Sequence, residues 1–211
     1  MTALHLRAPV AHLTVLLLAL ITSLLLSPSI NDNSVAGTLF SCLMLITLMT
    51  TLTPLATDTH RVRLILKITG IILILLRLGV TDTQLPKWVS LFSLASVIIF
   101  HTVLMVLLMK HLFSDAPQTE KLLAAINFYL LTGINFGFVY VLLNLLSPGA
   151  FNFPSGGIYD WPDFLYFSFV SLTTLGYGDI IPISPLAQSL AALEAVIGVL
   201  SPTVMIARFV K

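Results

Sequence analysis

The residues best suited to chemistry form one run near the C-terminus, residues 173–179, with the sequence Thr-Thr-Leu-Gly-Tyr-Gly-Asp. Gly176 and Gly178 alternate with larger residues, and glycine adopts positive φ angles without steric cost. This alternation lets successive backbone carbonyls point in one direction. Four copies around an axis would stack the carbonyls in rings, with the Thr174 hydroxyl as the innermost ring. Such rings can replace the hydration shell of a monovalent cation.

The residues just before this run predict a short helix that leads into it. Asp160 and Asp163 suit a helix start, since their carboxylates meet free amide groups and the positive end of the helix dipole, and Pro162 fits the first turn. The following residues, 164–173, predict a helix of about ten residues, half of the roughly 20 needed to cross a bilayer. We therefore expect a re-entrant helix whose negative end faces the cation.

In this setting the run resembles the filter of the tetrameric pore-loop potassium channels, which reads Thr-Val-Gly-Tyr-Gly and is usually followed by Asp. Leu175 stands where valine or isoleucine is commonest, a change that concerns packing more than ion type. The resemblance covers roughly the last 90 residues. It implies K⁺ coordination by Thr174, Leu175, Gly176 and Tyr177, with Gly178 completing the filter. It also implies three further copies of the chain around one pore.

The resemblance implies a set of supports behind and beside the filter. Tyr166 and Phe167 match positions where the family places aromatic braces, and Thr173 and Asp179 flank the filter. We expect Tyr166 to bond Asp179, the alternative being simple interfacial packing. Val170 stands where some family members carry a buried acid, so that brace is missing.

The sixth apolar run is expected to be the inner, pore-lining helix. Gly198 matches the hinge glycine of many family members, and Pro202 removes a backbone donor one turn later. Together they predict a bend, while close helix packing is the other explanation for Gly198. Glu194 is the only acid in this run, and an intramembrane carboxyl is a functional candidate. It either braces the pore helix through Ser168 or Ser171, or acts as a protonatable gate.

Helical spacing places four residues of this run on one stripe that we expect to face the pore. A hydrophobic constriction at Ile206 or Val210 would gate by dewetting. The stripe consists of Val199, Thr203, Ile206 and Val210.

Composition fixes the setting in which these residues must be positioned. Apolar residues make up 57% of the 211 residues, charged residues only 9%, and the mean hydropathy is +1.03. Soluble domains carry roughly 25% charged residues, so a water-soluble enzyme, a nucleic-acid-binding protein and a disordered chain are excluded. Six apolar runs are long enough to span a membrane. They comprise residues 10–26, 35–56, 64–80, 88–109, 122–146 and 185–210.

The predicted fold is therefore an all-α membrane protein with six transmembrane helices, plus the re-entrant pore helix and filter between helices five and six, assembled as a homotetramer. Residues 1–115 would form a four-helix region and residues 116–211 the pore domain. The fourth run has no Lys or Arg, whereas a voltage sensor requires several such charges in this span. It holds only His101, and Arg77 lies in the third, so we expect weak or no voltage gating.

The basic residues predict an integral, multi-pass protein of the plasma (cell inner) membrane with both termini in the cytoplasm. An N-terminal signal peptide is the alternative for the first run. Expected partners are K⁺, the lipid bilayer and copies of the chain, with no nucleic acid and no cofactor besides the permeant ion. The predicted cytoplasmic residues are Arg7, Arg61, Arg63, Lys67, Lys110, Lys121, Arg208 and Lys211, against Arg77 and Lys87 outside.

Three other functions compete with a potassium channel. A non-selective cation channel would be expected to lack the Tyr177–Gly178 pair, and a non-conducting regulatory subunit would not need a complete filter. An intramembrane enzyme would need clustered acids, a nucleophile with its base, or metal ligands. His101 and Glu194 are the only plausible parts and lie on separate spans.

Overall fold

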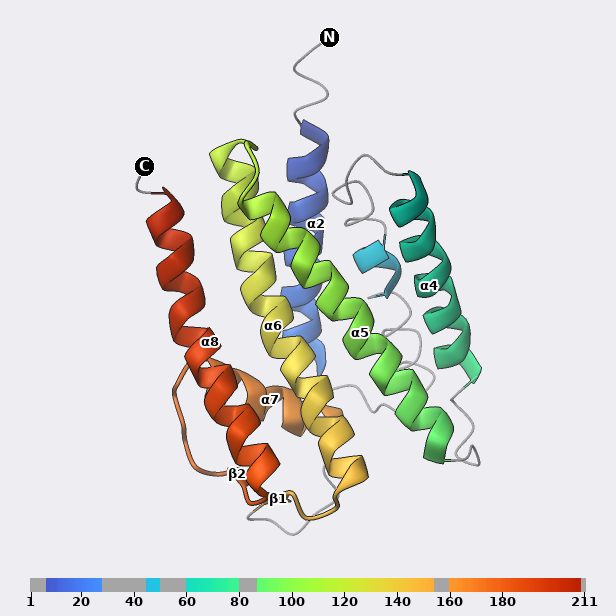
Figure 1. The fold of residues 1–211 in the computed structure, drawn as a ribbon, viewed down its shortest axis with the longest axis vertical. Helices are drawn as coiled ribbons and strands as arrows, with labels where there is room; N and C mark the ends of the chain where they lie inside the picture. Colours follow the sequence, from blue (N-terminus) through green and yellow to red (C-terminus); the bar gives the residue numbers. More distant parts are fainter. Residues whose placement is uncertain (1–6, 28–44, 50–59, 80–86, 154–159, 210–211) are drawn as a thin grey trace. The chain divides into compact units, whose positions relative to one another are not determined.

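A computed structural model of the chain describes residues 7–27, 45–49, 60–79, 87–153 and 160–209 (Figure 1). Within it the chain forms two compact units, Met1–Leu130 and Leu131–Lys211. The boundary between the units falls inside helix α6, which spans Gln118–Leu146. The predicted division after residue 115 precedes this helix and stays a prediction.

Apart from the turn at residues 113–117, the described part of the first unit is helical. It contains α2 (Arg7–Leu26), a helical stretch at 45–49, α4 (His60–Gly79), α5 (Lys87–Leu112) and the first part of α6. Gly70 of α4 lies directly against Met49, where a Cβ on the glycine would fall within 2.0 Å of the methionine sulfur. His101 is buried within α5, and its Nδ1 lies 2.8 Å from the Val97 carbonyl.

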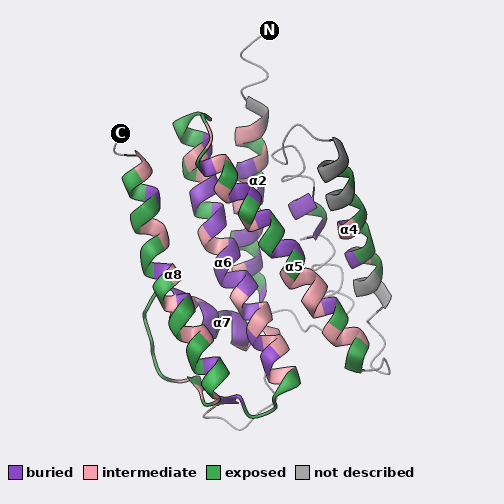
Figure 2. Cartoon of the chain, viewed as in Figure 1, coloured by how far each residue is buried: buried purple, intermediate pink, exposed green. Residues whose placement is uncertain are grey.

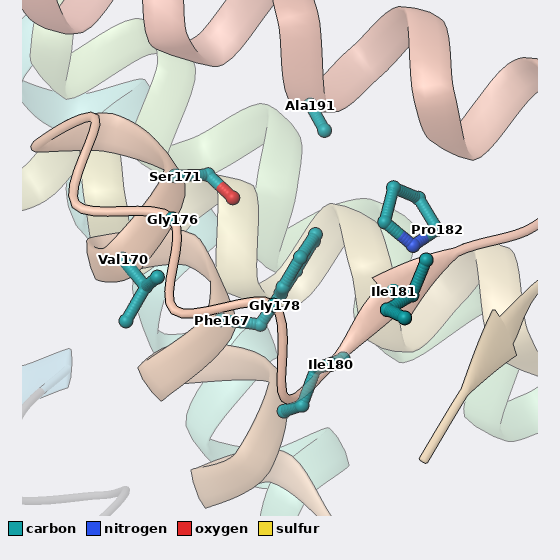
Figure 3. A pocket seen from close by; sticks show the side chains of 9 residues that line it. All are labelled: Phe167, Val170, Ser171, Gly176, Gly178, Ile180, Ile181, Pro182 and Ala191. Carbon is teal, nitrogen blue, oxygen red and sulfur yellow. The ribbon is translucent and has the colours of Figure 1, made fainter. Parts of the chain in front are cut away.

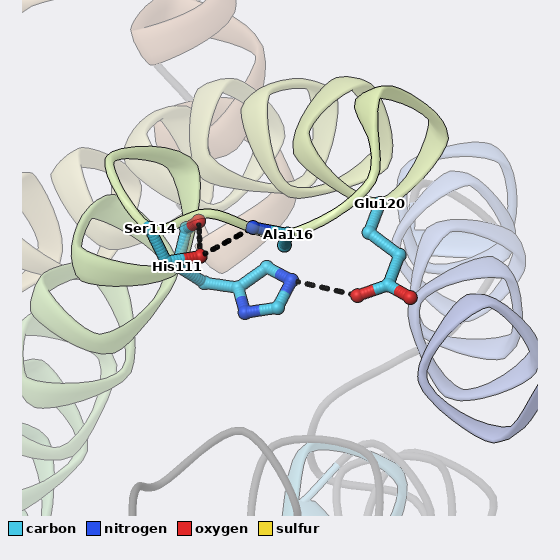
Figure 4. A network of polar contacts seen from close by, with 4 residues as sticks. All are labelled: His111, Ser114, Ala116 and Glu120. Carbon is cyan, nitrogen blue, oxygen red and sulfur yellow. Dashed lines mark hydrogen bonds and ion pairs between the residues drawn. The ribbon is translucent and has the colours of Figure 1, made fainter. Parts of the chain in front are cut away.

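A short turn connects α5 to α6 and is closed by polar contacts (Figure 4). The Ser114 hydroxyl donates to the His111 carbonyl at 2.7 Å and accepts the amide of Ala116 at 3.3 Å. His111 Nε2 lies 3.2 Å from a carboxylate oxygen of Glu120, in the first turn of α6. These contacts fix how α6 begins after α5 ends.

The second unit contains residues 173–179, the segment predicted to be the filter. It contains the rest of α6, strand β1 (Phe151–Asn152), helix α7 (Trp161–Leu172), strand β2 (Ile181–Pro182) and helix α8 (Pro185–Phe209). Within this unit α7 lies between α6 and α8 (Figure 1). Residues 173–179 therefore lie between a short helix and a long one, and their role as a filter stays a prediction.

Four described helices are long and apolar enough to cross a membrane: Pro9–Leu26, Lys87–Leu112, Gln118–Leu146 and Pro185–Phe209. They match the first, fourth, fifth and sixth predicted spans. The described part of the protein is therefore mostly helical and contains several candidate membrane spans. The third predicted span coincides with α4, which carries four basic residues and does not reach this standard. The second lies mostly outside the described residues, so six spans remain a prediction.

A two-stranded antiparallel ribbon joins the segment after α6 to the segment after the filter. Phe151 pairs with Pro182, and Asn152 pairs with Ile181. The amides of Ile183 and Ser184 both donate to the carbonyl of Ala150, at 2.8 and 3.2 Å. The two ends of the filter-bearing segment are thereby held together outside the helices.

Aromatic packing forms the core of the second unit, and α7 is among its most buried elements (Figure 2). Tyr140 of α6 packs edge-on against Phe151 and Phe167, with ring centroids 5.6 and 5.0 Å apart. Phe164 completes the group at 5.4 Å from Phe151. Edge-to-face pairs of this kind add to the energy of apolar burial, so α7 packs on a group of mutually contacting aromatic rings.

Candidate functional site

The short helix before the filter begins as its sequence predicts. Asp160 is extended and precedes α7, Pro162 lies in the first turn, and the backbone N–H of Asp160 donates to the Asp163 carboxylate at 3.0 Å. The helix has 12 residues, which at 1.5 Å each rise about 18 Å, against roughly 30 Å for the hydrocarbon core. A helix of this length cannot cross a bilayer alone.

The filter backbone alternates in handedness. Thr174, Gly176 and Gly178 have φ angles of 58°, 57° and 76°, whereas Leu175 and Tyr177 between them do not have positive φ. Thr174 is the only non-glycine residue with positive φ among the described residues, and such a residue costs about 1–2 kcal/mol. Strain of this size persists only where the surroundings impose it, and it clusters at functional sites.

The start of the filter is anchored to the end of α7. The amides of Leu175 and Gly176 donate to the carbonyl of Val170 at 2.9 and 3.3 Å, and the amide of Thr174 donates to Ser171 at 2.9 Å. The position of the pore helix therefore sets the position of the first filter residues. Thr173 caps α7 and its hydroxyl donates to the Phe169 carbonyl at 2.6 Å.

The two larger filter residues are exposed in the single chain. Leu175 is 55% exposed and Tyr177 is 65% exposed. A Cβ built on Gly176 or Gly178 would meet no atom within 4 Å. The glycines are thus required by their backbone angles and not by lack of space.

A cavity of about 260 Å³ lies behind the filter (Figure 3). Its walls come from α7, the filter, the residues after it and α8, and they are mostly apolar. It is lined by Phe167, Val170, Ser171, Gly176, Gly178, Ile180, Ile181, Pro182 and Ala191.

Tyr166 and Asp179 are joined across the filter. The Tyr166 hydroxyl donates to one carboxylate oxygen of Asp179 at 2.6 Å, and the Ile180 amide donates to the other at 3.0 Å. The bond from Tyr166 lowers the pKa of Asp179 below its usual range and raises the pKa of Tyr166 to about 12. Neighbouring Phe167 instead points into the aromatic core behind α7. The two aromatic residues thus hold different sides of the pore helix.

Glu194 of α8 lies against α7 and is shielded from solvent. It is completely buried, and its two carboxyl oxygens lie 2.5 Å from the hydroxyls of Tyr140 and Ser168. The Ser168 hydroxyl also lies 2.6 Å from the carbonyl of Gly133. One side chain of α8 is therefore connected to α6 and α7 together. Of the two serines named from sequence, the contact is with Ser168.

Gly198 follows one turn after Glu194 and touches the end of the pore helix. A Cβ there would fall 1.7 Å from the carbonyl oxygen of Leu172. Glu194 meets Ser168 and Gly198 meets Leu172, so the two helices touch at positions four residues apart on each. This is the close-packing explanation for Gly198 that the sequence left open; the hinge stays a prediction.

The lower part of α8 remains helical through Pro202 up to Phe209. Pro202 removes the amide that would have bonded the Gly198 carbonyl. The Thr203 hydroxyl donates to the neighbouring Val199 carbonyl at 3.0 Å. Val199, Thr203 and Ile206 are all exposed in the single chain. Val210, the other proposed constriction residue, lies outside the described residues.

Two contributors to the site escaped sequence reasoning. Tyr140 lies 54 positions before Glu194, and nothing in its local pattern distinguishes it from an interfacial tyrosine. Gly137 of α6 lies against Trp161 and Leu165 of α7, where a Cβ would be 3.1 Å from the Trp161 ring. Gly133 and Gly137 form a Gly-x-x-x-Gly spacing, which is a known signal for close helix approach in membranes.

The C-terminal part of the chain is similar to known channel proteins. Residues 128–211 match the family model described as "Ion channel". The chain is also 33% identical over 91 residues to the inward rectifier potassium channel Kirbac3.1 of Paramagnetospirillum magnetotacticum, an alignment that covers 39% of this chain and 28% of that protein. No solved structure gives a significant match.

The matched region includes α7, the filter and α8. This chain spans less than a third of the length of the relative it matches. The two matches support an ion-channel pore related to potassium channels, in a membrane protein with several apolar helices, and they point to a channel and not to an enzyme.

Proposed function

We propose that four copies of this chain form a potassium-selective channel that conducts K⁺ passively. The observation that carries the proposal is the alternating backbone of Thr174–Gly178, which has positive φ at every second residue and follows a helix too short to cross the membrane. Alternating handedness is what a chain needs to turn successive carbonyls to one side. The relative matched over the C-terminal region is itself described as a potassium channel.

The proposed chemistry is exchange of water oxygens for backbone oxygens. Carbonyls of Thr174, Leu175, Gly176 and Tyr177, with the Thr174 hydroxyl at the inner end, would coordinate the ion as it sheds its hydration shell. The C-terminal ends of four α7 helices would each contribute about half a negative charge toward the ion. Neighbouring ions then displace one another along the rings.

The exposed filter side chains support assembly as a homotetramer. One chain supplies one strand of filter, and a ring of carbonyls needs several strands. Leu175 and Tyr177 are more than half exposed, although the proposed filter to which they belong would lie at membrane depth. Irregular backbone at that depth is tolerated only when it is buried in protein or lines a water-filled cavity. Neighbouring copies would provide that cover.

The proposed gate lies toward the C-terminal end of α8. Val199, Thr203 and Ile206 would line the cavity, and Ile206 with Val210 would form the constriction. Gly198 and Pro202 would permit bending. Both termini would lie in the cytoplasm of a cell inner membrane. Opening would depend weakly on voltage, because residues 88–109 contain no Lys or Arg.

Ion uptake into liposomes tests this proposal. The purified full chain should take up K⁺ down its gradient and Na⁺ far more slowly, with block by Ba²⁺. Equal uptake of both ions would support a non-selective cation channel instead. If the wild-type chain takes up neither ion, Ile206→Ala and Val210→Ala decide the case. They should open the constriction and restore K⁺ uptake, and continued silence in both would support a non-conducting subunit.

A further inference from the structure

The contacts of Glu194 allow the hydrogens in its hydrogen-bond chain to be counted, and this count decides whether its carboxyl group is charged or neutral. Three oxygen–oxygen contacts form one continuous chain: Tyr140 Oη to Glu194 Oε2 at 2.5 Å, Glu194 Oε1 to Ser168 Oγ at 2.5 Å, and Ser168 Oγ to Gly133 O at 2.6 Å. Oxygen atoms approach this closely only with a hydrogen between them. The chain therefore requires three hydrogens.

The available hydroxyl groups supply only two. Tyr140 has one O–H and Ser168 has one O–H, while the Gly133 carbonyl can only accept. Because the Gly133 oxygen has no hydrogen, the Ser168 hydrogen must lie toward it. Ser168 then has only lone pairs for Glu194. A carboxylate facing those lone pairs would repel them, so the third hydrogen has to come from the carboxyl group itself.

The surroundings of Glu194 agree with this count. The side chain is fully buried, and among the described residues its carboxyl oxygens contact only the two hydroxyls and no basic group. An ionised carboxylate buried without a cation is strongly disfavoured, and such groups normally become neutral. Tyr140 and Ser168 are the polar side chains that face it from α6 and α7.

We infer that Glu194 is a neutral carboxylic acid in the folded protein and that it positions the pore helix as a hydrogen-bond donor. Its O–H donates to Ser168, whose own O–H donates to Gly133, while Tyr140 donates to its other oxygen. No covalent bond changes. We call these hydrogen bonds, from Tyr140 through Glu194 and Ser168 to Gly133, the relay. The inference rests on the proposed function only for its consequence, which is that the relay holds the filter in position through α7.

The consequence follows from where the relay is attached. Ser168 lies two residues before Val170, whose carbonyl holds the amides of Leu175 and Gly176. The relay links α8 and α6 to that part of α7, so loosening it lets the filter entrance shift. Selectivity and filter lifetime should therefore depend on the donor at position 194 and not on a negative charge there.

Two substitutions separate a donor from a charge. In Glu194→Gln the amide N–H can donate to Ser168 while the amide oxygen accepts from Tyr140, so K⁺ over Na⁺ selectivity should stay within about twofold of wild type. Glu194→Leu has similar volume but no hydrogen bond, so it leaves the buried Tyr140 hydroxyl without its acceptor and the Ser168 oxygen without its donor, while the Ser168 hydroxyl keeps its bond to Gly133. It should lower the selectivity ratio or the tetramer lifetime by about tenfold.

Infrared difference spectroscopy reads the proton directly and does not depend on conduction. Wild-type protein in liposomes at neutral pH should show a carboxylic-acid carbonyl band that shifts in D₂O. Glu194→Gln should remove that band, and the matched control Glu120→Gln, at another buried glutamate, should keep it.

Either of two results would overturn the inference. One is a wild-type spectrum with no acid band lost in Glu194→Gln. The other is a Glu194→Gln channel as damaged as Glu194→Leu, which would show that the charge is needed. Failure of the proposed function appears differently: the wild-type protein would lack K⁺ selectivity while the acid band remained.

Discussion

At the scale of single residues, the positive φ angles of the filter carry the largest consequences. Gly178 has a φ of 76° in open space, so Gly178→Ala introduces conformational strain without a clash. The cost is about 1–2 kcal/mol per chain, repeated in each subunit. We expect the variant to lose most of its preference for K⁺ over Na⁺ in the flux assay.

Gly149 offers a matched control for that substitution. Its φ of 87° and its open surroundings are similar, but it lies in the turn after α6. Gly149→Ala should cost comparable stability, measured as tetramer melting temperature, and leave ion preference unchanged. If the two variants change selectivity equally, the filter assignment is wrong.

The contact between Tyr166 and Asp179 predicts an acid response. Because the Tyr166 bond lowers the pKa of Asp179, the contact is complete above the ordinary aspartate pKa of about 4. It is lost as the external pH falls through the lower pKa of the folded protein. Tyr166→Phe removes the bond and returns that pKa toward its ordinary value, so the remaining bond from the Ile180 amide to the ionised Asp179 carboxylate is weakened at a higher pH.

External acidification should therefore reduce steady K⁺ current at a higher pH in Tyr166→Phe than in wild type. The measurement is current against external pH in a planar bilayer with internal pH fixed. Ser96→Ala, which removes a hydroxyl that donates to the Phe92 carbonyl on α5, is the control. Superimposable wild-type and Tyr166→Phe curves would show that the brace does not support the filter.

At the scale of helices, the structure predicts that two glycines tolerate an added side chain differently. A Cβ at Gly198 meets the backbone oxygen of Leu172 at 1.7 Å, whereas one at Gly133 meets the far end of the Phe169 ring at 2.6 Å. A ring can turn away, but a helix carbonyl cannot. Gly198→Ala should therefore destabilise the assembly by about 3 kcal/mol or more, and Gly133→Ala by about 1 kcal/mol.

Thermal unfolding of the detergent-solubilised tetramer measures both values. Pro202→Ala serves as the comparison for a hinge, since it restores a helical donor without touching α7. If Gly198→Ala leaves the melting temperature unchanged and alters only channel opening, Gly198 is a hinge and its contact with Leu172 is incidental.

Local chemistry explains how much of the site was predictable. The start of α7 followed from Asp160, Pro162 and Asp163, and the positive φ angles at Gly176 and Gly178 followed from the alternating glycines. Each of these signals lies within a few residues. The choice between hinge and contact at Gly198 was not predictable, since both demand the same missing side chain. Tyr140 was missed because its partner Glu194 lies 54 residues away, and only the fold brings them together.

At the scale of the whole molecule, a single chain supplies one strand of the proposed filter and cannot close a ring of carbonyls by itself. The first residues of the proposed filter strand are hydrogen-bonded to α7, and Asp179 after it is hydrogen-bonded to Tyr166. The side chains of Leu175 and Tyr177 are exposed. Four helices reach the length and hydropathy of membrane spans. The proposed function therefore requires both a tetramer in the membrane and a carbonyl-lined path along its axis.

The most direct test of that account is the reversal potential of the purified full chain in a planar bilayer with K⁺ on one side and Na⁺ on the other. A potassium-selective channel should give a reversal potential close to the potassium equilibrium value, far from zero. A reversal potential near zero, in channels that open and conduct, would show that K⁺ and Na⁺ pass alike and would contradict it.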